Sequence, residues 1–447
     1  MNKVCFVFLA LMILVTSIAL TGKAGSQGST VIGFDKKHGL SSTKFQALRK
    51  FLESEGFIVK DIEGFSEEAD VIVIVNQTSP LSEGEISGLD SYIRSGHSVL
   101  IVRSVVGAVF NAIPSKDPVC SIKVIGGCDP FETSANSTFF KYSRSVVAKG
   151  SSLENITDNM LKLLTSKKVW VDRDRNWRRS EGDIAAENLV VMVGQVYGRG
   201  RVAISSVEFF NDDLLAQLDN KIFVKELFSW LSSPSLAVKR YSEVRSRLAS
   251  FLAMRNDLEK VGGNSSVLMG VAQILNKSLE GIIEVINKGR SEEALSLLND
   301  IDKKISDYTS FVSRLLVVET KISEFKKDLE TNASKYNISL DKFLEELESL
   351  NSQKRSIYEK WYVGDISGAN QTASDVLNEL DRLRSEVSFY ITSELEARRK
   401  KQEEQQWILT LATAAIIIVI VIVVAALLYR KRKKEEKVEV FIRPPGS

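Results

Sequence analysis

Residues 70–102 read DVIVIVNQTSPLSEGEISGLDSYIRSGHSVLIV, and this stretch decides the predicted fold. Its run at 71–75 is apolar and β-branched throughout, which is typical of a strand that is covered on both faces. A helix with a Ser-x-x-Glu capping box follows at 82–94 and leads into a second strand at 98–102. Strand, helix and strand in this order indicate a parallel sheet with helices on its faces.

Outward from this unit, short apolar runs and helical patterns continue from residue 30 to residue 232. The predicted strands are 31–34, 57–62, 71–75, 98–102, 121–125, 168–172, 189–197 and 201–206, and the predicted helices are 42–55, 82–94, 153–164 and 221–231. The last two strands are joined by Gly198-Arg199-Gly200 in a hairpin-like connection. We therefore predict an α/β domain with a doubly wound, mostly parallel sheet over residues 30–232, which is long enough for one sizeable core.

Several short segments of this domain match a known group in their order along the chain. They are Phe34-Asp35-Lys36-Lys37-His38-Gly39, Glu55-Gly56-Phe57, Val71 to Val75, Leu81-Ser82-Glu83-Gly84-Glu85, Tyr197-Gly198-Arg199-Gly200-Arg201-Val202, Asp219-Asn220 and Trp230-Leu231. Together they resemble the class I glutamine amidotransferase-like domains. More narrowly, they resemble the membrane-tethered branch of that group, whose members are found beside transport or gliding components.

The residues after the central strand depart from that group. True amidotransferases carry a nucleophilic Cys in a tight turn there, with a downstream His and Glu, because the thiolate needs a base and an oxyanion hole. Here residues 98–102 run into Arg103-Ser104-Val105-Val106, His97 precedes the strand, and no His follows it. We therefore expect no amidotransferase reaction and no enzymatic activity.

Asp35 and His38 are the best candidates for a ligand site. They follow the first predicted strand at the carboxyl edge of the sheet, where open α/β folds bind ligands. The alternative is structural, with Asp35 capping a turn and His38 bonded to the backbone. Ser104 is a weaker candidate because it lacks the Gly-x-Ser-x-Gly context of a nucleophile elbow. The chain has two His, which excludes a His-rich metal site, and we predict neither a metal nor a cofactor.

The loop at 172–179 carries a second set of binding candidates, Arg173, Arg175 and Trp177. Arg and Trp are among the residues most enriched at binding hot spots. The alternative is a solvated hairpin loop whose Trp folds back onto the sheet.

Cysteines and sequons indicate an exported chain. Outside the first apolar segment there are two cysteines, Cys120 and Cys128, and we predict a disulfide between them, with two free buried thiols as the alternative. Eight Asn-x-Ser/Thr sequons lie between the two apolar ends, and we predict glycosylation, with unmodified asparagines as the alternative. They begin at Asn76, Asn136, Asn155, Asn264, Asn276, Asn332, Asn337 and Asn370.

Residues 236–406 contain no proline and repeat apolar residues at spacings of three and four, which predicts a stalk of long helices. Helix breaks are predicted at 262–264, 288–289, 336–337 and 363–365. Residues 287–294 and 362–369 match at an offset of about 75 residues, which predicts two related three-helix units at about 238–312 and 313–406. Convergent heptad-like patterning is the alternative. The same apolar stripe would also support a homo-oligomer through a coiled coil.

An apolar run at 407–429 is followed at once by Arg430-Lys431-Arg432-Lys433-Lys434. A bilayer needs about 20 apolar residues, so we predict a transmembrane helix, and the basic tail at 430–447 suits anionic lipid headgroups. Lys3 and the apolar segment at 4–20 predict a signal peptide at 1–24, with an uncleaved anchor as the alternative.

These patterns predict a type I single-pass protein of the plasma membrane with its bulk outside the cell. Many sequons and a Glu/Lys-rich stalk indicate an archaeal envelope, with a bacterial one as the alternative. The net charge of +2 gives no case for nucleic acid. We expect a non-catalytic cell-surface binding protein whose ligand is a partner protein or a glycan. The alternatives are an accessory subunit of a membrane transporter and a hydrolase that uses Asp35 and His38.

Overall fold

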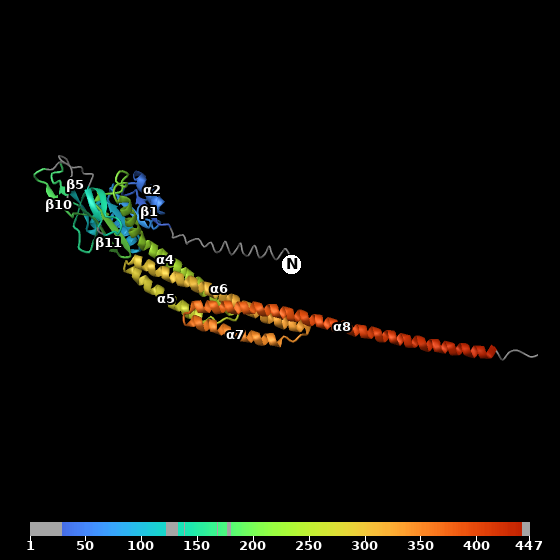
Figure 1. Cartoon of the computed structure of the whole chain (residues 1–447). Coiled ribbons are helices and arrows are strands. Elements are labelled where there is room, and N and C mark those ends of the chain that lie inside the picture. Colours follow the sequence, from blue (N-terminus) through green and yellow to red (C-terminus); the bar gives the residue numbers. More distant parts are fainter. Residues whose placement is uncertain (1–28, 122–132, 138, 168, 177–179, 440–447) are drawn as a thin grey trace, which may run out of the picture. The chain divides into compact units, whose positions relative to one another are not determined.

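The computed structural model describes residues 29–121, 133–137, 139–167, 169–176 and 180–439 (Figure 1). The described residues fall into two compact units, one of residues up to 252 together with 269–307, and one of residues 253–268 together with those from 308 onward. The first unit holds a mixed sheet whose described strands follow the order β10-β9-β5-β7-β6-β8-β11-β12-β4-β3-β1-β2, with β13 paired to β7. Long helices follow the sheet in the chain.

One half of the sheet consists of neighbouring parallel strands, as the sequence predicted. They are β2 (Ile58–Ile62), β1 (Val31–Asp35), β3 (Val71–Val75), β4 (Ser98–Val102) and β12 (Gly200–Ser205). Helix α2 (Gln46–Ser54) connects β1 to β2, and helix α3 (Glu83–Arg94) connects β3 to β4. The predicted capping box of α3 is present, because Ser82 and Glu85 each accept a hydrogen bond from the other's backbone N–H.

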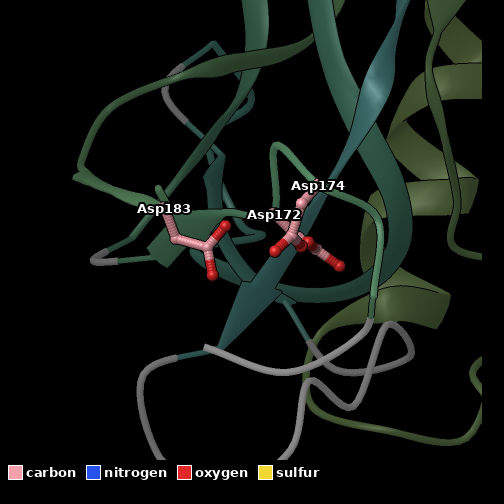
Figure 2. Close-up of side chains that lie close together, drawn as sticks. All are labelled: Asp172, Asp174 and Asp183. Atoms are coloured by element: carbon pink, nitrogen blue, oxygen red, sulfur yellow. The ribbon is translucent and has the colours of Figure 1, made fainter. Parts of the chain in front are cut away.

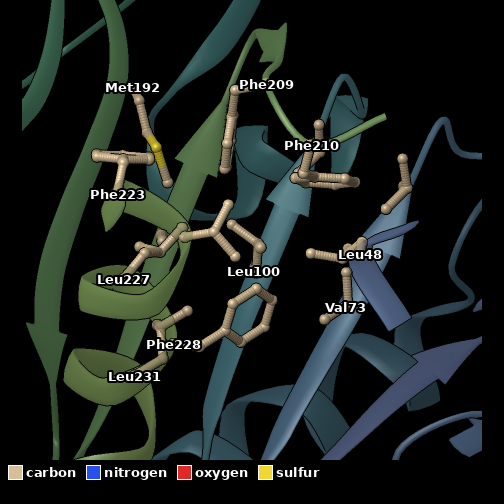
Figure 3. Packing of buried hydrophobic residues seen from close by; sticks show 14 of the residues in the cluster. Leu48, Val73, Leu100, Met192, Phe209, Phe210, Phe223, Leu227, Phe228 and Leu231 are labelled. Carbon is tan, nitrogen blue, oxygen red and sulfur yellow. The ribbon is translucent and has the colours of Figure 1, made fainter. Parts of the chain in front are cut away.

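Strand β3 is apolar throughout because both of its faces are covered. Its three valines belong to one buried cluster and its two isoleucines to another. The first cluster includes side chains of α2 and of α4 (Asn220–Lys260), and Figure 3 shows Leu227 and Phe228 of α4 lying near Leu100 of β4. The second includes side chains of α3 and of the 3-10 helix η2 (Val105–Phe110). A continuous apolar strand is what this environment requires.

The remaining strands pair antiparallel, so the prediction of a mostly parallel sheet is wrong for this half. They are β5 (Ile113–Ser121), β6 (Thr133–Ser137), β7 (Ser145–Glu154), β8 (Leu161–Ser166), β9 (Val169–Val171), β10 (Ile184–Ala186), β11 (Val190–Tyr197) and β13 (Val207–Glu208). Strand β9 confirms the strand predicted at 168–172, and β11 and β12 confirm the hairpin, with Tyr197 opposite Gly200. Beyond Ser121, the strand predicted at 121–125 lies outside the described residues.

The helix predicted at 153–164 is also wrong. Strand β7 ends at Glu154, Asn155 has a positive φ of 59°, and β8 begins at Leu161. A left-handed residue does not lie inside a right-handed helix, so the chain turns back here. Leu153 and Leu163, both within the predicted helix, are buried on two different strands.

Helix α4 continues through Pro234, where the sequence predicted a boundary. Proline has no N–H, so it leaves the carbonyl of Trp230, four residues earlier, without its helical donor. Arg201 Nη1 donates to this oxygen at 2.6 Å, and the Ser233 hydroxyl donates to it at 3.0 Å. The helix continues because a side chain of β12 replaces the missing donor.

The predicted long helices are present after this point. They are α5 (Ser266–Asn287), α6 (Ser291–Tyr336), α7 (Asp341–Tyr362) and α8 (Ile366–Glu439). The turns after α5 and α7 are alike, because Gly289 and Gly364 have φ of 72° and 85°, and Arg290 N–H and Asp365 N–H donate to carbonyls five residues earlier. The turn after α4 has the same geometry, with Gly262 at φ 81° and Gly263 N–H donating to the Leu258 carbonyl, so the predicted repeat of two three-helix units stays a prediction.

Helix α8 changes its environment along its length. Ala369, Val376 and Leu383 are buried, whereas every residue from Trp407 to Tyr429 is exposed. Among the described residues, α8 is the helix that is long and apolar enough to cross a membrane by length and composition.

Candidate functional site at the carboxyl edge of the sheet

Asp35 and His38 lie together directly after β1, and both are buried, with exposed fractions of 0% and 1%. Asp35 Oδ2 lies 2.6 Å from His38 Nδ1, and His38 Nε2 lies 3.1 Å from Oε1 of Glu85 in α3. Asp35 Oδ1 accepts from the backbone N–H groups of Lys37 and Gly64, each at 3.0 Å. Both ring nitrogens and both carboxylate oxygens therefore have partners inside the protein.

The loop around His38 is tied to the residues that follow β3. Thr78 N–H donates to the His38 carbonyl at 2.9 Å, and the Ser79 hydroxyl donates to the Lys37 carbonyl at 2.8 Å. The His38 ring stacks on Phe65 with centroids 5.8 Å apart. The ends of β1 and β3 are where an open α/β sheet ordinarily admits a ligand. Here the chain's own groups occupy that place, and Asp35 caps the turn.

Glu85 closes this corner from its solvent side. Lys37 Nζ lies 2.5 Å from Glu85 Oε1, and the Ser82 backbone N–H donates to Oε2 at 2.8 Å. The hydrogen bond from Lys37, followed by those from Ser82, holds the pKa of Glu85 well below its usual range. The carboxylate that faces His38 is thus ionised at neutral pH.

Arg103 follows β4 and forms a second, more open corner. Its φ is +50°, its N–H donates to the Ser205 carbonyl at 2.7 Å, and its side chain is 46% exposed. Its Nη1 donates to Oε1 of Glu208 at 3.0 Å, and Asn76 Nδ2 donates to the same oxygen at 2.6 Å. Asn76 follows β3 and also has a positive φ, of 48°. Two neighbouring strands therefore end in left-handed residues that share one carboxylate.

Neither His forms a base–nucleophile pair. Ser104 is buried, and its hydroxyl donates to Gln77 Oε1 at 2.9 Å. His97 Nδ1 lies 2.9 Å from Ser95 Oγ, but the Ser95 hydroxyl donates to the Tyr92 carbonyl at 2.7 Å and so accepts from the ring. Burial lowers the pKa of His97. A nucleophilic serine needs a base that takes its proton, and the described residues supply no such arrangement around these histidines.

Strand β9 leads into a loop with three carboxylates, those of Asp172, Asp174 and Asp183 (Figure 2). One oxygen from each lies within 4.8 Å of the others. Asp183 accepts from the N–H groups of Arg173 and Ser180 at 3.0 and 2.7 Å, and Asp174 accepts from the Ser180 hydroxyl at 2.8 Å. Donors from the loop itself thus hold two of the three carboxylates.

The predicted loop candidates Arg173 and Arg175 are exposed, and Arg175 has a positive φ of 56°. Trp177 lies outside the described residues. In the strand order, β9 and β1 lie near opposite edges of the sheet, so these arginines and the Asp35–His38 pair do not form one site.

The predicted disulfide is not described, because Cys128 lies outside the described residues; Cys120 stands in β5 opposite Trp170 of β9. None of the eight sequon asparagines is buried. Asn155, Asn264, Asn276 and Asn337 are exposed, and Asn76, Asn136, Asn332 and Asn370 are half-buried. A glycan on Asn76 would replace one of the two hydrogens of the amide that donates to Glu208.

A cleft of about 1210 Å³ lies elsewhere on the first unit, between residues 139–142, α4, the β11–β12 hairpin and the start of α6. Arg201 lines it and is 3% exposed. Its two Nη atoms each lie 2.6 Å from an oxygen of Glu292, and its guanidinium lies 4.7 Å from the ring centroid of Trp230. The Glu292 side chain is 59% exposed, so only partial burial disfavours its ionisation; the hydrogen bonds and charge of Arg201 outweigh this and lower the pKa of Glu292.

Three carboxylates that pair with His38, Arg103 and Arg201 were not predicted from the sequence as site residues. They are Glu85, Glu208 and Glu292. Each lies on a different element from the His or Arg that it holds, 47, 105 and 91 residues away. The sequence did indicate Glu85 as a capping residue. For the other two, no local pattern marks the partner, because packing brings them together.

No protein-family model matches the chain, and no curated protein matches it in sequence. Among solved structures it is similar to the mmIFT52 N-terminal domain, at 12% identity and a TM-score of 0.36 over 45% of this chain and 97% of that one. It is also similar to the exo-β-1,4-mannosidase Op5Man5 from Opitutaceae bacterium strain TAV5, at 12% identity and a TM-score of 0.26 over 46% of this chain and 34% of that one. These likenesses concern the course of the chain and say nothing of its activity. The chain thus has a mixed α/β domain that is followed by long helices.

Proposed function

We propose that this chain is a single-pass surface protein that presents a non-catalytic, amidotransferase-like α/β domain on a helical stalk and acts by binding a partner. The observation that carries the proposal is the residue after β4. Arg103 stands there, half exposed and paired with Glu208. A cation that is half exposed can contact an anionic group of a partner, whereas turnover of an acyl or amide substrate needs a nucleophile and a base.

Helix α8 supports the anchored part of the proposal. A stretch of exposed apolar residues longer than about 20 residues is stable in a bilayer and costly in water. The same helix packs buried residues from Ala369 to Val387 and contains the apolar run from Trp407 to Tyr429. The predicted plasma-membrane location, with the sheet outside and the basic tail inside, is part of this proposal.

The hydrolase alternative is not favoured by the geometry. Asp35 and His38 have their polar atoms bonded internally, and a substrate would have to displace Glu85 or the loop to reach them. The transporter alternative predicts a particular kind of partner, a permease or an ATPase, and the same experiment tests it.

The experiment is in-cell crosslinking of the tagged full-length protein, purification in mild detergent and mass spectrometry of what is retained. We expect one protein at near-stoichiometric amounts, and no turnover of amide, acyl or glycosyl substrates by the same preparation. Sealed vesicles test the membrane topology. Protease added outside should cleave the sheet domain, whereas an epitope on the basic tail should be protected. Turnover that disappears in a Ser104→Ala or His38→Ala variant that remains folded would overturn the proposal.

A further inference from the structure

The open corner formed by Asn76, Arg103 and Glu208 is separate from the closed corner around His38. We propose that the open corner binds a carboxylate that bears a small apolar substituent, with Arg103 contacting the carboxylate. This inference rests on the proposed function, and it names the chemistry that the partner presents.

Backbone strain is the first observation behind the inference. Asn tolerates the left-handed region, but a long side chain such as that of Arg103, at φ +50°, is uncommon there. The sheet imposes this conformation, because the N–H groups of Asn76 and Arg103 donate to the carbonyls of Val102 and Ser205 at 2.9 and 2.7 Å. Such strain persists where the surroundings fix it, and it is concentrated at functional sites. Its effect here is to direct one arginine to the carboxyl edge of β4.

The second observation is how the guanidinium is held. Glu208, whose side chain is 12% exposed, accepts from Arg103 Nη1 and from Asn76 Nδ2 with the same oxygen. A guanidinium has five N–H donors, and the described residues provide an acceptor for Nη1 alone. A guanidinium that one carboxylate fixes on one edge is oriented to donate hydrogen bonds from its other N–H groups to a second, planar carboxylate.

The third observation is the exposed apolar surface of η2, the element that follows Arg103 in the chain. In η2, Val105 is 67% exposed and Val109 is 41% exposed, while Val106 and Phe110 are buried and fix the turn. An apolar group on the ligand would cover the two exposed valines. Because Glu208 already compensates one positive charge, a monoanion is favoured over a phosphate dianion, which this glutamate would repel more strongly. A peptide C-terminus and a free short branched acid share this chemistry.

The test uses the full-length protein in detergent and a fluorescent peptide that ends in valine with a free α-carboxylate. We expect the anisotropy to rise on binding, and the affinity to fall about tenfold or more when the peptide ends in an amide or when Arg103→Gly is used, because a charge-assisted hydrogen bond is lost. Glu293→Ala, at an exposed pair remote in sequence, is the matched control and should bind like wild type. Competition by N-acetylvaline points to the free acid as a sufficient ligand, and its failure points to the C-terminus of a polypeptide.

Equal binding of the acid and the amide, equal binding by Arg103→Gly, or equal competition by inorganic sulfate would each overturn the inference. The crosslinking experiment separates its failure from that of the proposed function. If a partner is retained by both wild type and Arg103→Gly, the binding function stands and the assignment to Arg103 is wrong. If wild type retains no partner and no probe binds, both proposals fail.

Discussion

The adjacent parallel strands β4 and β12 each have an arginine at one end, and each arginine has a glutamate partner. The two arginines differ in burial and in the number of their hydrogen-bond acceptors. Arg201, at the start of β12, is 3% exposed and donates to Glu292, to Ser233 Oγ and to the Trp230 carbonyl. Arg103, after the end of β4, is half exposed and donates to Glu208. The number of internal acceptors and the burial of the guanidinium, rather than the presence of a glutamate, therefore separate a structural arginine from one that can meet a partner.

The largest effect should come from removing Glu292, the exposed carboxylate that pairs with the buried Arg201. Glu292→Ala leaves the Arg201 charge buried without its bidentate partner, which should lower the free energy of unfolding by about 3 kcal/mol, the low end for breaking a buried pair because Glu292 itself is 59% exposed. Urea unfolding of the detergent-solubilised chain, followed by pulse proteolysis, measures this. Glu293→Ala is the matched control, because its pair with Arg290 is exposed and should contribute about 0.5 kcal/mol or less. Equal effects of the two variants would contradict the structural role of Arg201.

The closed corner should respond less strongly, but in the same direction. His38→Ala leaves Asp35 Oδ2 buried without its partner, which should cost about 2 kcal/mol of unfolding free energy. Lys36→Ala, at an exposed pair with Glu63, is the control and should leave stability nearly unchanged. If His38→Ala behaves like Lys36→Ala in the same urea assay, the corner is not closed and a ligand site at Asp35 and His38 regains support.

Burial also explains which half of the sheet could be predicted from the sequence. The parallel half of the sheet was predictable because β3 and β4 are apolar at nearly every position, which is the pattern that coverage on both faces requires. The antiparallel half was not, because a strand such as β7 mixes buried and half-buried positions and so has no continuous apolar run that marks it as a strand.

Some features of the candidate site could likewise be predicted from the sequence, and others could not. The proximity of Asp35 and His38 followed from their three-residue spacing after a strand. Their burial did not, because it depends on Glu85 reaching over from α3. Pro234 gives the clearest case: local rules end the helix there, and a donor from β12, far away in sequence, keeps it intact.

The hydrogen bond from Arg201 to the Trp230 carbonyl leads to a third prediction, that the effects of changing Arg201 and Pro234 are coupled. In an Arg201→Ala background the Trp230 carbonyl loses its strongest donor, and Pro234→Ala restores a backbone N–H four residues later. We expect the second substitution to recover about 1 kcal/mol of unfolding free energy in that background and less in the wild type. A double-mutant cycle in urea measures the difference. Additive effects would show that Arg201 does not replace the helical hydrogen bond.

The smallest effect is expected at the half-exposed arginine. Arg103→Gly removes an ion pair whose carboxylate, Glu208, is 12% exposed and keeps its hydrogen bond from Asn76, which should cost about 1 kcal/mol, and it relieves a left-handed backbone that costs a non-glycine residue about 1 kcal/mol. The variant should therefore be about as stable as wild type in the urea assay, while it loses its ligand. Asn76→Gly, at the neighbouring left-handed position, is the comparison, and it should be less stable than Arg103→Gly, because Asn tolerates this conformation and the change also removes the amide that donates to Glu208. Marked destabilisation by Arg103→Gly would show that this arginine, like Arg201, is part of the framework, and the difference between the two ends of the strands would disappear.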